Sequence, residues 1–520
     1  MSPNREKSTE RWVLAATVLA SSMAFIDQSA LTIALPAIQS DLHATGSQLL
    51  WFVGGYTLML AALILLGGTL GDRIGRRRVF FFGILVFTAA STACAAAPSA
   101  GFLLVGRLVQ GIGGAMMIPG SLSIISTVFP AERRGRAIGT WSAATTLTTA
   151  GGPIIGGVLA QAGLWRGVFL INLPLGLAAM AALLSRVPDD APRADGKGID
   201  LAGSALITLS LAALAFGFID GPNFGFGSAS VIAAFVIGAA ALALFILVEH
   251  LKPEPMVPLA VFRNITFTGA NLLTLFLYGA LSAFSFFLPL ALVQAQGYSE
   301  SAAGLTMLPF VVLLAGLSRW AGRLSDRIGP RVPLVVGPLL VGAGFLVCST
   351  AAPTLGAAGY WSTYFPGIIL FGVGMGVTVA PLTTTVMTAL DRGLTGTASG
   401  INNAVSRLAG VLAVAILGAL AILHFTGYVL EGASGAGLTS SEHARLVGQL
   451  RNLGNAQVPR GLPAASTETL ARLFRAGFLD TFRLVLRICA ALSWASALLA
   501  ALLVRRPRPE APFSYDDQPA

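Results

Sequence analysis

Apolar runs long enough to cross a lipid bilayer recur along the whole chain. A bilayer core about 30 Å thick is crossed by roughly 20 apolar residues in a helix. Run length and helix breakers predict about fourteen spans, near 12–34, 49–70, 79–97, 101–129, 137–160, 166–185, 200–219, 229–248, 266–292, 302–320, 332–351, 361–388, 397–423 and 479–504. The pattern therefore predicts an all-α polytopic membrane protein. We expect the first run to be a retained span, because it is longer than the ~7–15 apolar residues of a signal peptide.

The polar segments between the runs set the expected orientation. Cytoplasmic loops of membrane proteins are enriched in Lys and Arg. With the N-terminus in the cytoplasm, 23 of the 33 basic residues fall in cytoplasmic segments, and the short outer loops hold only Arg166. We therefore expect the protein to lie in the cytoplasmic (inner) membrane. Both termini should be in the cytoplasm, and the segment 424–478 should be outside.

A ten-residue segment occurs twice. The sequence GTLGDRIGRR at 68–77 and the sequence GRLSDRIGPR at 322–331 agree at seven of ten positions, and each lies between two apolar runs. Two halves in the same orientation are a common transporter architecture, with the binding site at their interface. The repeat predicts a six-helix bundle at 1–187, a linker with two extra spans at 188–255, and a second six-helix bundle at 256–520.

Two segments are too polar to span. The Pro- and Asp-rich stretch 188–198 is predicted to be a cytoplasmic linker. The outer loop 424–478 contains two helix-like stretches, 442–451 and 467–478, so it is either a small helical cap or a disordered loop.

Composition excludes several classes of function. The formal net charge is +10, but the basic residues cluster between apolar runs, which indicates topology rather than nucleic-acid binding. The three cysteines and four histidines show no metal-ligand spacing, and no nucleotide-binding loop is present. We therefore expect no metal, no organic cofactor and no enzymatic activity.

The repeated segment and several others together resemble the major facilitator superfamily, in its fourteen-span drug–proton antiporter branch. The similar segments are 26–36, 68–77, 107–114, 151–157, 164–166 and 172–176. The resemblance covers nearly the whole chain and departs from the family at Thr148, where the fifth-span motif usually begins with Gly. It implies a proton gradient as the energy source.

The loop motif combines Gly, Asp and Arg. Asp72 can accept backbone N–H bonds at a helix N-terminus, and Gly71 and Gly75 allow tight chain reversal. Such a loop either latches the two bundles in one state or only keeps its arginines inside the cell. The residues assigned to a latch are Gly68, Asp72, Arg73, Gly75, Arg76, Asp326 and Arg327.

The fifth span contains small residues around a proline. Small residues let helices approach closely, and a proline kinks a helix. The resemblance implies that Gly152, Pro153, Gly156 and Gly157 form a seal against leak, and ordinary close packing is compatible with this.

Asp27 is the one acid that we place deep in a span. A charged carboxyl there is costly, so Asp27 carries the transported proton, neutralises a cationic substrate, or bonds a neighbouring helix. The resemblance implies a role for Arg107 in the proton pathway, and a purely structural arginine is the alternative. Residues assigned to the substrate cavity, with interfacial placement as the alternative, are Gln28, Tyr56, Trp141, Asn271, Asn402 and Arg407.

Proton-coupled export of small lipophilic organic compounds, such as drugs and antibiotics, is the leading hypothesis. The alternatives are a dedicated exporter or importer of one metabolite and a non-transporting membrane sensor or scaffold. The expected partners are the organic substrate, protons and the lipid bilayer, and a periplasmic adaptor is left open.

Overall fold

The protein is described from a computed structural model that covers residues 3–187, 200–353, 356–391, 394–434, 439–450, 458 and 464–505. Throughout these residues the regular structure is helical and contains no strand. Fourteen helical stretches are long and apolar enough to cross a membrane. The predicted all-α polytopic fold is therefore confirmed, and the predicted linker 188–198 lies outside the described residues.

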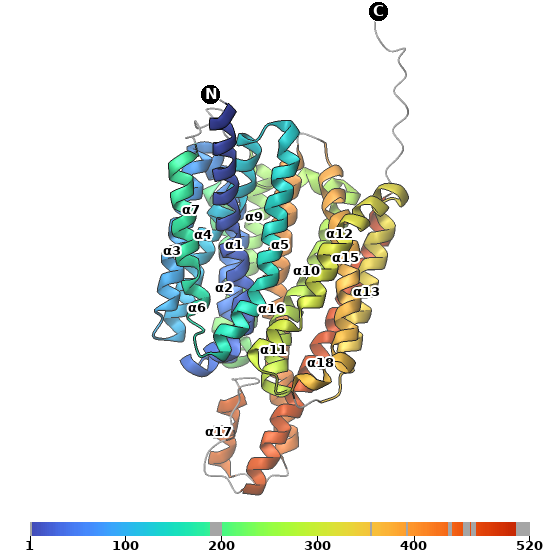
Figure 1. The fold of residues 1–520 in the computed structure, drawn as a ribbon. Coiled ribbons are helices and arrows are strands. Elements are labelled where there is room, and N and C mark those ends of the chain that lie inside the picture. Colours follow the sequence, from blue (N-terminus) through green and yellow to red (C-terminus); the bar gives the residue numbers. More distant parts are fainter. Residues whose placement is uncertain are drawn as a thin grey trace, which may run out of the picture.

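The first half of the chain forms one bundle (Figure 1). Its helices are α1 (Pro3–Leu42), α2 (Gly46–Ile74), α3 (Arg76–Ala95), α4 (Ala100–Val128), α5 (Ala131–Gln161), α6 (Gly167–Leu170) and α7 (Asn172–Arg186). Helix α1 packs against α5 and α7, and α4 packs against α2 and α3. The short α6 and α7 together make the sixth span of this bundle.

The second half forms the other bundle. It contains η1 (Leu259–Arg263), α10 (Ile265–Leu290), η2 (Ala291–Ala295), α11 (Glu300–Leu305), α12 (Leu308–Ile328), α13 (Arg331–Ser349), η3 (Ala357–Gly359), α14 (Tyr360–Thr363), α15 (Phe365–Thr388), α16 (Thr395–Ala433), α17 (Ser440–Leu450) and α18 (Ala464–Leu503). The halves meet chiefly where α2 packs on α16 and where α5 packs on α11. The site between the halves is therefore framed by these helices.

Two further spans, α8 (Leu201–Phe224) and α9 (Ala229–Leu251), lie between the halves in sequence. They pack on each other, and α8 also packs on α2 and α16, so the pair covers the seam between the bundles. Asp200 caps α8 through the Gly203 amide at 2.8 Å and pairs with Lys252 beyond α9 at 2.8 Å. Burial raises the pKa of Asp200, but the bonds from Lys252 and Gly203 outweigh it and hold that pKa below its ordinary value.

The two ends of the molecule are distinct (Figure 1). We call the end at which α1 begins and the α2–α3 turn lies the terminal end, and the end that carries α17 the hairpin end. At the terminal end, Gly75 and Gly329 occupy matching places in the repeat and have positive φ angles of 104° and 84°. The chain reverses at these two glycines, whereas Gly71, which we expected to assist, lies inside α2.

The segment 424–478 differs in part from the predicted loop. Helix α16 continues to Ala433 and α18 already begins at Ala464, so both spans extend beyond the bundle as helices. Phe425 packs its ring 6.2 Å from that of Phe474, and His424 contacts Asp480 at 2.9 Å. Apolar contacts along these extensions explain why α16 continues as helix where a loop was predicted. Both stretches predicted as helical are confirmed, since α17 covers most of 442–451 and α18 contains 467–478.

Candidate functional site

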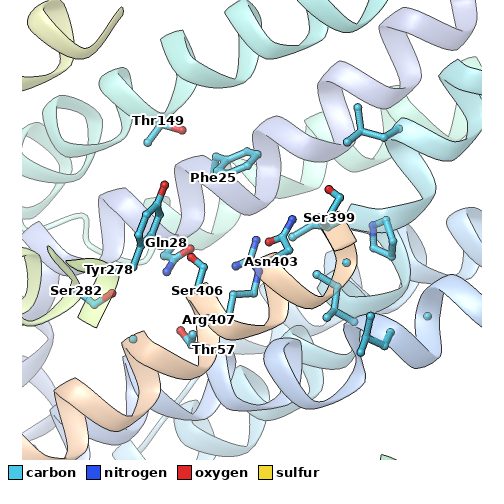
Figure 2. Close-up of a pocket in the computed structure, with 18 of the residues that line it drawn as sticks. Phe25, Gln28, Thr57, Thr149, Tyr278, Ser282, Ser399, Asn403, Ser406 and Arg407 are labelled. Atoms are coloured by element: carbon cyan, nitrogen blue, oxygen red, sulfur yellow. The ribbon is translucent and has the colours of Figure 1, made fainter. Parts of the chain in front are cut away.

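A large cavity lies between the two halves. Its volume is about 1420 Å³, and residues of α1, α2, α4, α5, α10, α12, α15 and α16 line it. Side chains near its centre include Phe25, Gln28, Tyr278, Asn403 and Arg407, all labelled in Figure 2. Ligand pockets for drug-sized molecules measure about 300–1,000 Å³, so this cavity can hold such a molecule with space to spare.

The cavity extends to the terminal end of the bundle. Its described lining there includes Gly68, Asp72 and Arg76 from the α2–α3 region, together with Asp200 and Glu254. The halves are in contact at the opposite end, where Gln294 donates to Gln39 at 3.0 Å. The structure is therefore a conformation whose cavity reaches the terminal end.

Asp27 lies behind the cavity wall, one residue before Gln28, and is completely buried. Its carboxylate forms an ion pair with Arg107 of α4. The other oxygen accepts hydrogen bonds from Gln110 at 2.7 Å and Asn172 at 3.2 Å. Every one of these partners is a donor, so the geometry suits the ionised form of Asp27.

Arg107 is also fixed on its remaining sides. Its Nε donates to the carbonyl of Phe52 at 2.9 Å, and its guanidinium carbon lies 4.4 Å from the centre of the Tyr56 ring. The guanidinium, which is 1% exposed, thus has a carboxylate, a carbonyl and an aromatic face as partners. An intramembrane arginine needs such partners because it keeps its charge.

Three residues of this network are absent from the candidates predicted from sequence. Gln110 and Asn172 each donate to Ser91 of α3, at 2.7 Å and 3.1 Å, so the network joins α1, α3, α4 and α7. Gln110 lies three residues after Arg107, and Asn172 begins a conspicuous Asn-Leu-Pro segment. A polar residue one helical turn from a buried arginine is the signal that could have identified Gln110.

The small residues of α5 make two different contacts. A Cβ at Gly152 or Gly156 would meet Ser29 or Ala30 of α1, inside the first bundle. A Cβ at Gly157 would lie 2.5 Å from the backbone oxygen of Glu300 in the second half. Pro153 lines the cavity, and its carbonyl approaches Gly304 of α11. The motif therefore closes the hairpin end of the cavity.

The loop motif makes contacts within its own half. Asp72 pairs with Arg76 at 2.8 Å, and Arg76 also donates to the carbonyl of Ser123 on α4 at 3.4 Å. We expected Asp72 to bind backbone amides at a helix N-terminus. In this conformation Asp72 lies in the last turn of α2 and its carboxylate pairs with Arg76, and no side-chain oxygen caps the N-terminus of α3. Arg73, Asp326 and Arg327 are exposed at the same end.

The residues predicted for the cavity divide into two groups. Gln28, Trp141 and Arg407 line it. The described lining does not include Tyr56, Asn271 or Asn402, which corrects the prediction for these three. Tyr56 is 1% exposed and packs on Arg107, and Asn402 donates to Asn271 at 3.2 Å, which joins α16 to α10.

Two bundles in parallel repeat around a central cavity, with a buried ion pair behind its wall, define a secondary transporter. The sequence profile of the Major Facilitator Superfamily matches residues 17–414. The chain is 30% identical over 499 residues to the tetracenomycin C resistance and export protein of Streptomyces glaucescens, covering 96% of this chain and 92% of that protein. The chain belongs to the Major Facilitator Superfamily, as its motifs predicted.

Other relatives and solved structures agree with this assignment. Multidrug resistance protein Stp of Mycobacterium tuberculosis is 34% identical over 417 residues, covering 79% of this chain and 76% of that protein. An inward-facing bacterial homolog of the human lysosomal transporter Spinster superposes with a TM-score of 0.61 at 19% identity, covering 98% of this chain and 100% of that chain. The xylose transporter XylE from E. coli, in an inward open conformation, superposes with a TM-score of 0.58 at 13% identity, covering 96% of this chain and 97% of that chain. These structures share the fold.

Proposed function

We propose that this protein exports small lipophilic organic compounds across the inner membrane in exchange for protons, with both termini in the cytoplasm. The observation that carries the proposal is the buried Asp27–Arg107 pair directly behind the wall of a large cavity. The proton gradient supplies the energy, and no cofactor takes part. The names of the relatives, which are resistance and export proteins, support export as the direction.

The cavity lining suits a bulky apolar molecule. Phe25, Phe310 and Met375 are among the residues that supply apolar surface, and aromatic and Met side chains adapt to varied lipophilic shapes. Polar side chains are interspersed in this surface, among them Gln28, Asn403 and several Ser and Thr hydroxyls. A site of this kind binds by burial of apolar area, with polar groups fixing orientation.

Asp27 is the proposed proton-binding group. In the present conformation its carboxylate accepts hydrogen bonds from donors only, as an ionised carboxylate does. A conformation open to the hairpin end that separates Asp27 from Arg107 would instead favour proton binding, because an isolated charge in the membrane is costly. Alternation between these two arrangements couples proton entry to substrate exit.

Efflux from intact cells tests the proposed function. Cells that express the protein should accumulate less of a lipophilic dye than control cells, and a protonophore should abolish the difference. A dedicated metabolite exporter would move few dyes, whereas a sensor or scaffold would move none. Accumulation that is equal in both cell types across a dye panel would contradict drug export.

The orientation can be measured by cysteine labelling. In a protein that lacks Cys94, Cys348 and Cys489, Ser434→Cys at the hairpin end should react with an impermeant maleimide in intact cells. Ser514→Cys should react only after the cells are opened. Protection of position 434 together with labelling of position 514 would reverse the proposed orientation.

The loop motif leads to a further testable prediction. Asp72→Asn should cut export several-fold while leaving expression unchanged, because it releases Arg76 from a half-exposed pair that contributes little to stability. Asp326→Asn is the matched control and should have a smaller effect, since Pro330 stands where the first copy has Arg76. Equal and mild effects on transport rate would indicate that both motifs act only in topology.

A further inference from the structure

Arg407 of α16 carries a charge in the central part of the cavity (Figure 2). The other charged side chains of the described lining are Asp72, Arg76, Asp200 and Glu254, which lie at the terminal end. Across the described chain, no carboxylate lies within ion-pair distance of Arg407, and its buried Nε has no hydrogen-bond acceptor. The centre of the cavity therefore has a net positive charge.

Asp27 does not balance this charge. It is 0% exposed, its oxygens are held by Arg107, Gln110 and Asn172, and it is not part of the described cavity lining. The two guanidinium groups thus differ in their partners, since Arg107 forms an ion pair with a carboxylate and Arg407 does not. An unpaired cation inside a membrane protein is costly, and a ligand that brings the opposite charge relieves this cost.

We propose that Arg407 binds an acidic group of the transported compound. The substrate class is then a lipophilic organic acid, with a carboxylate or an ionised phenol or enol. The planar fork of a guanidinium can bind such an oxyanion through two parallel hydrogen bonds. This inference deepens the proposed function and rests on it.

The neighbours of Arg407 fit an amphipathic acid. Gln28, Asn403 and Ser406 lie around it in Figure 2 and offer further hydrogen-bond donors. Phe25 and Tyr278 present rings in the same lining, where the apolar body of the compound can pack. A lipophilic cation would meet the same rings but also a like charge, without an available carboxylate in the central lining.

Binding to the purified full-length protein tests this charge preference without relying on transport. Fluorescein and rhodamine 123 share a xanthene core, but the first is an anion and the second a cation. Fluorescence anisotropy should show tighter binding of fluorescein. Arg407→Gln should weaken fluorescein binding by about tenfold or more, since a hydrogen bond to a charged group is lost, and should not weaken rhodamine 123 binding. Arg407→Lys, which keeps the charge, should retain part of the affinity.

Two controls separate the interpretations. Arg483→Gln removes a guanidinium of α18 outside the cavity and should leave both dyes unaffected. A chloride ion could also neutralise Arg407, so the assay is repeated in gluconate. If Arg407→Gln no longer weakens fluorescein binding in gluconate, the site binds chloride. The proposal that Arg407 binds an acidic substrate would then be overturned.

The remaining outcomes are also decisive. Absence of fluorescein binding, a preference for rhodamine 123, or equal loss of both dyes in Arg407→Gln would overturn the inference. Protonophore-sensitive efflux that persists alongside any of these results would leave the proposed export intact. Conversely, an Arg407-dependent preference for the anion in a protein that shows no coupled efflux would contradict only the proposed function.

Discussion

Asp27→Asn protein should fold and insert in the membrane but should export its substrate against a gradient no faster than vesicles without the protein. The substitution keeps the shape of the side chain and its bonds to Gln110 and Asn172, but it removes the group that can ionise. A transporter without its proton-binding group cannot use the proton gradient, although it can still equilibrate substrate downhill. Everted vesicles measure both quantities, as dye uptake and as substrate-induced release of protons.

Stability must be separated from coupling in this test. Removing one partner of a buried ion pair costs about 3–5 kcal/mol, because the remaining charge is left uncompensated. The double variant Asp27→Asn with Arg107→Gln removes both charges and should restore any lost expression without restoring coupled export. Asp41→Asn breaks an exposed pair with Arg166 and serves as the control. Full protonophore-sensitive export by Asp27→Asn protein would show that another group carries the proton.

Much of the fold follows from the sequence because lipid imposes a simple constraint. Each span must satisfy its backbone hydrogen bonds internally, so apolar run length predicts helices directly. The predicted break at 424–478 shows the limit of this rule. Helix around Phe474 was predicted, but the continuation of α16 past Phe425 to Ala433 was not, because packing between the two helices rather than hydropathy stabilises it.

The site was predictable where a residue is chemically out of place in its surroundings. Asp27 and Arg107 are charged residues inside apolar runs, and the structure pairs them. Tyr56 and Asn402 were assigned to the cavity because polar or aromatic residues in a span can face a substrate. The direction of each side chain depends on the rotation of its helix about its axis. These helices are apolar on every face, so the periodicity of the sequence does not specify that rotation.

Gly157→Ala protein should fold and bind substrate but leak, because the added methyl group acts on the contact between the halves. A Cβ at position 157 would lie 2.5 Å from the oxygen of Glu300 and 2.9 Å from the Cα of Ser301. Backbone atoms cannot move away as a flexible side chain can. Overpacking costs about 1–3 kcal/mol, and here the cost falls on the conformation closed at the hairpin end. That conformation should therefore become about 5- to 150-fold less populated relative to the open one.

The expected readout is a rise in accessibility from the hairpin side. A cysteine at Gln294, whose amide bonds Gln39 across the halves, should react faster with an impermeant maleimide in Gly157→Ala than in the parent protein. Gly151→Ala is the matched control, since a Cβ there has nothing within 4 Å. Gly156→Ala should instead lower expression, because its Cβ would meet Ala30 within the first bundle. Equal labelling rates in Gly157→Ala and Gly151→Ala would mean that α5 does not seal the cavity. Because Gly156 and Gly157 are adjacent on α5 but face different bundles, their distinct outcomes separate packing within a bundle from closure between bundles.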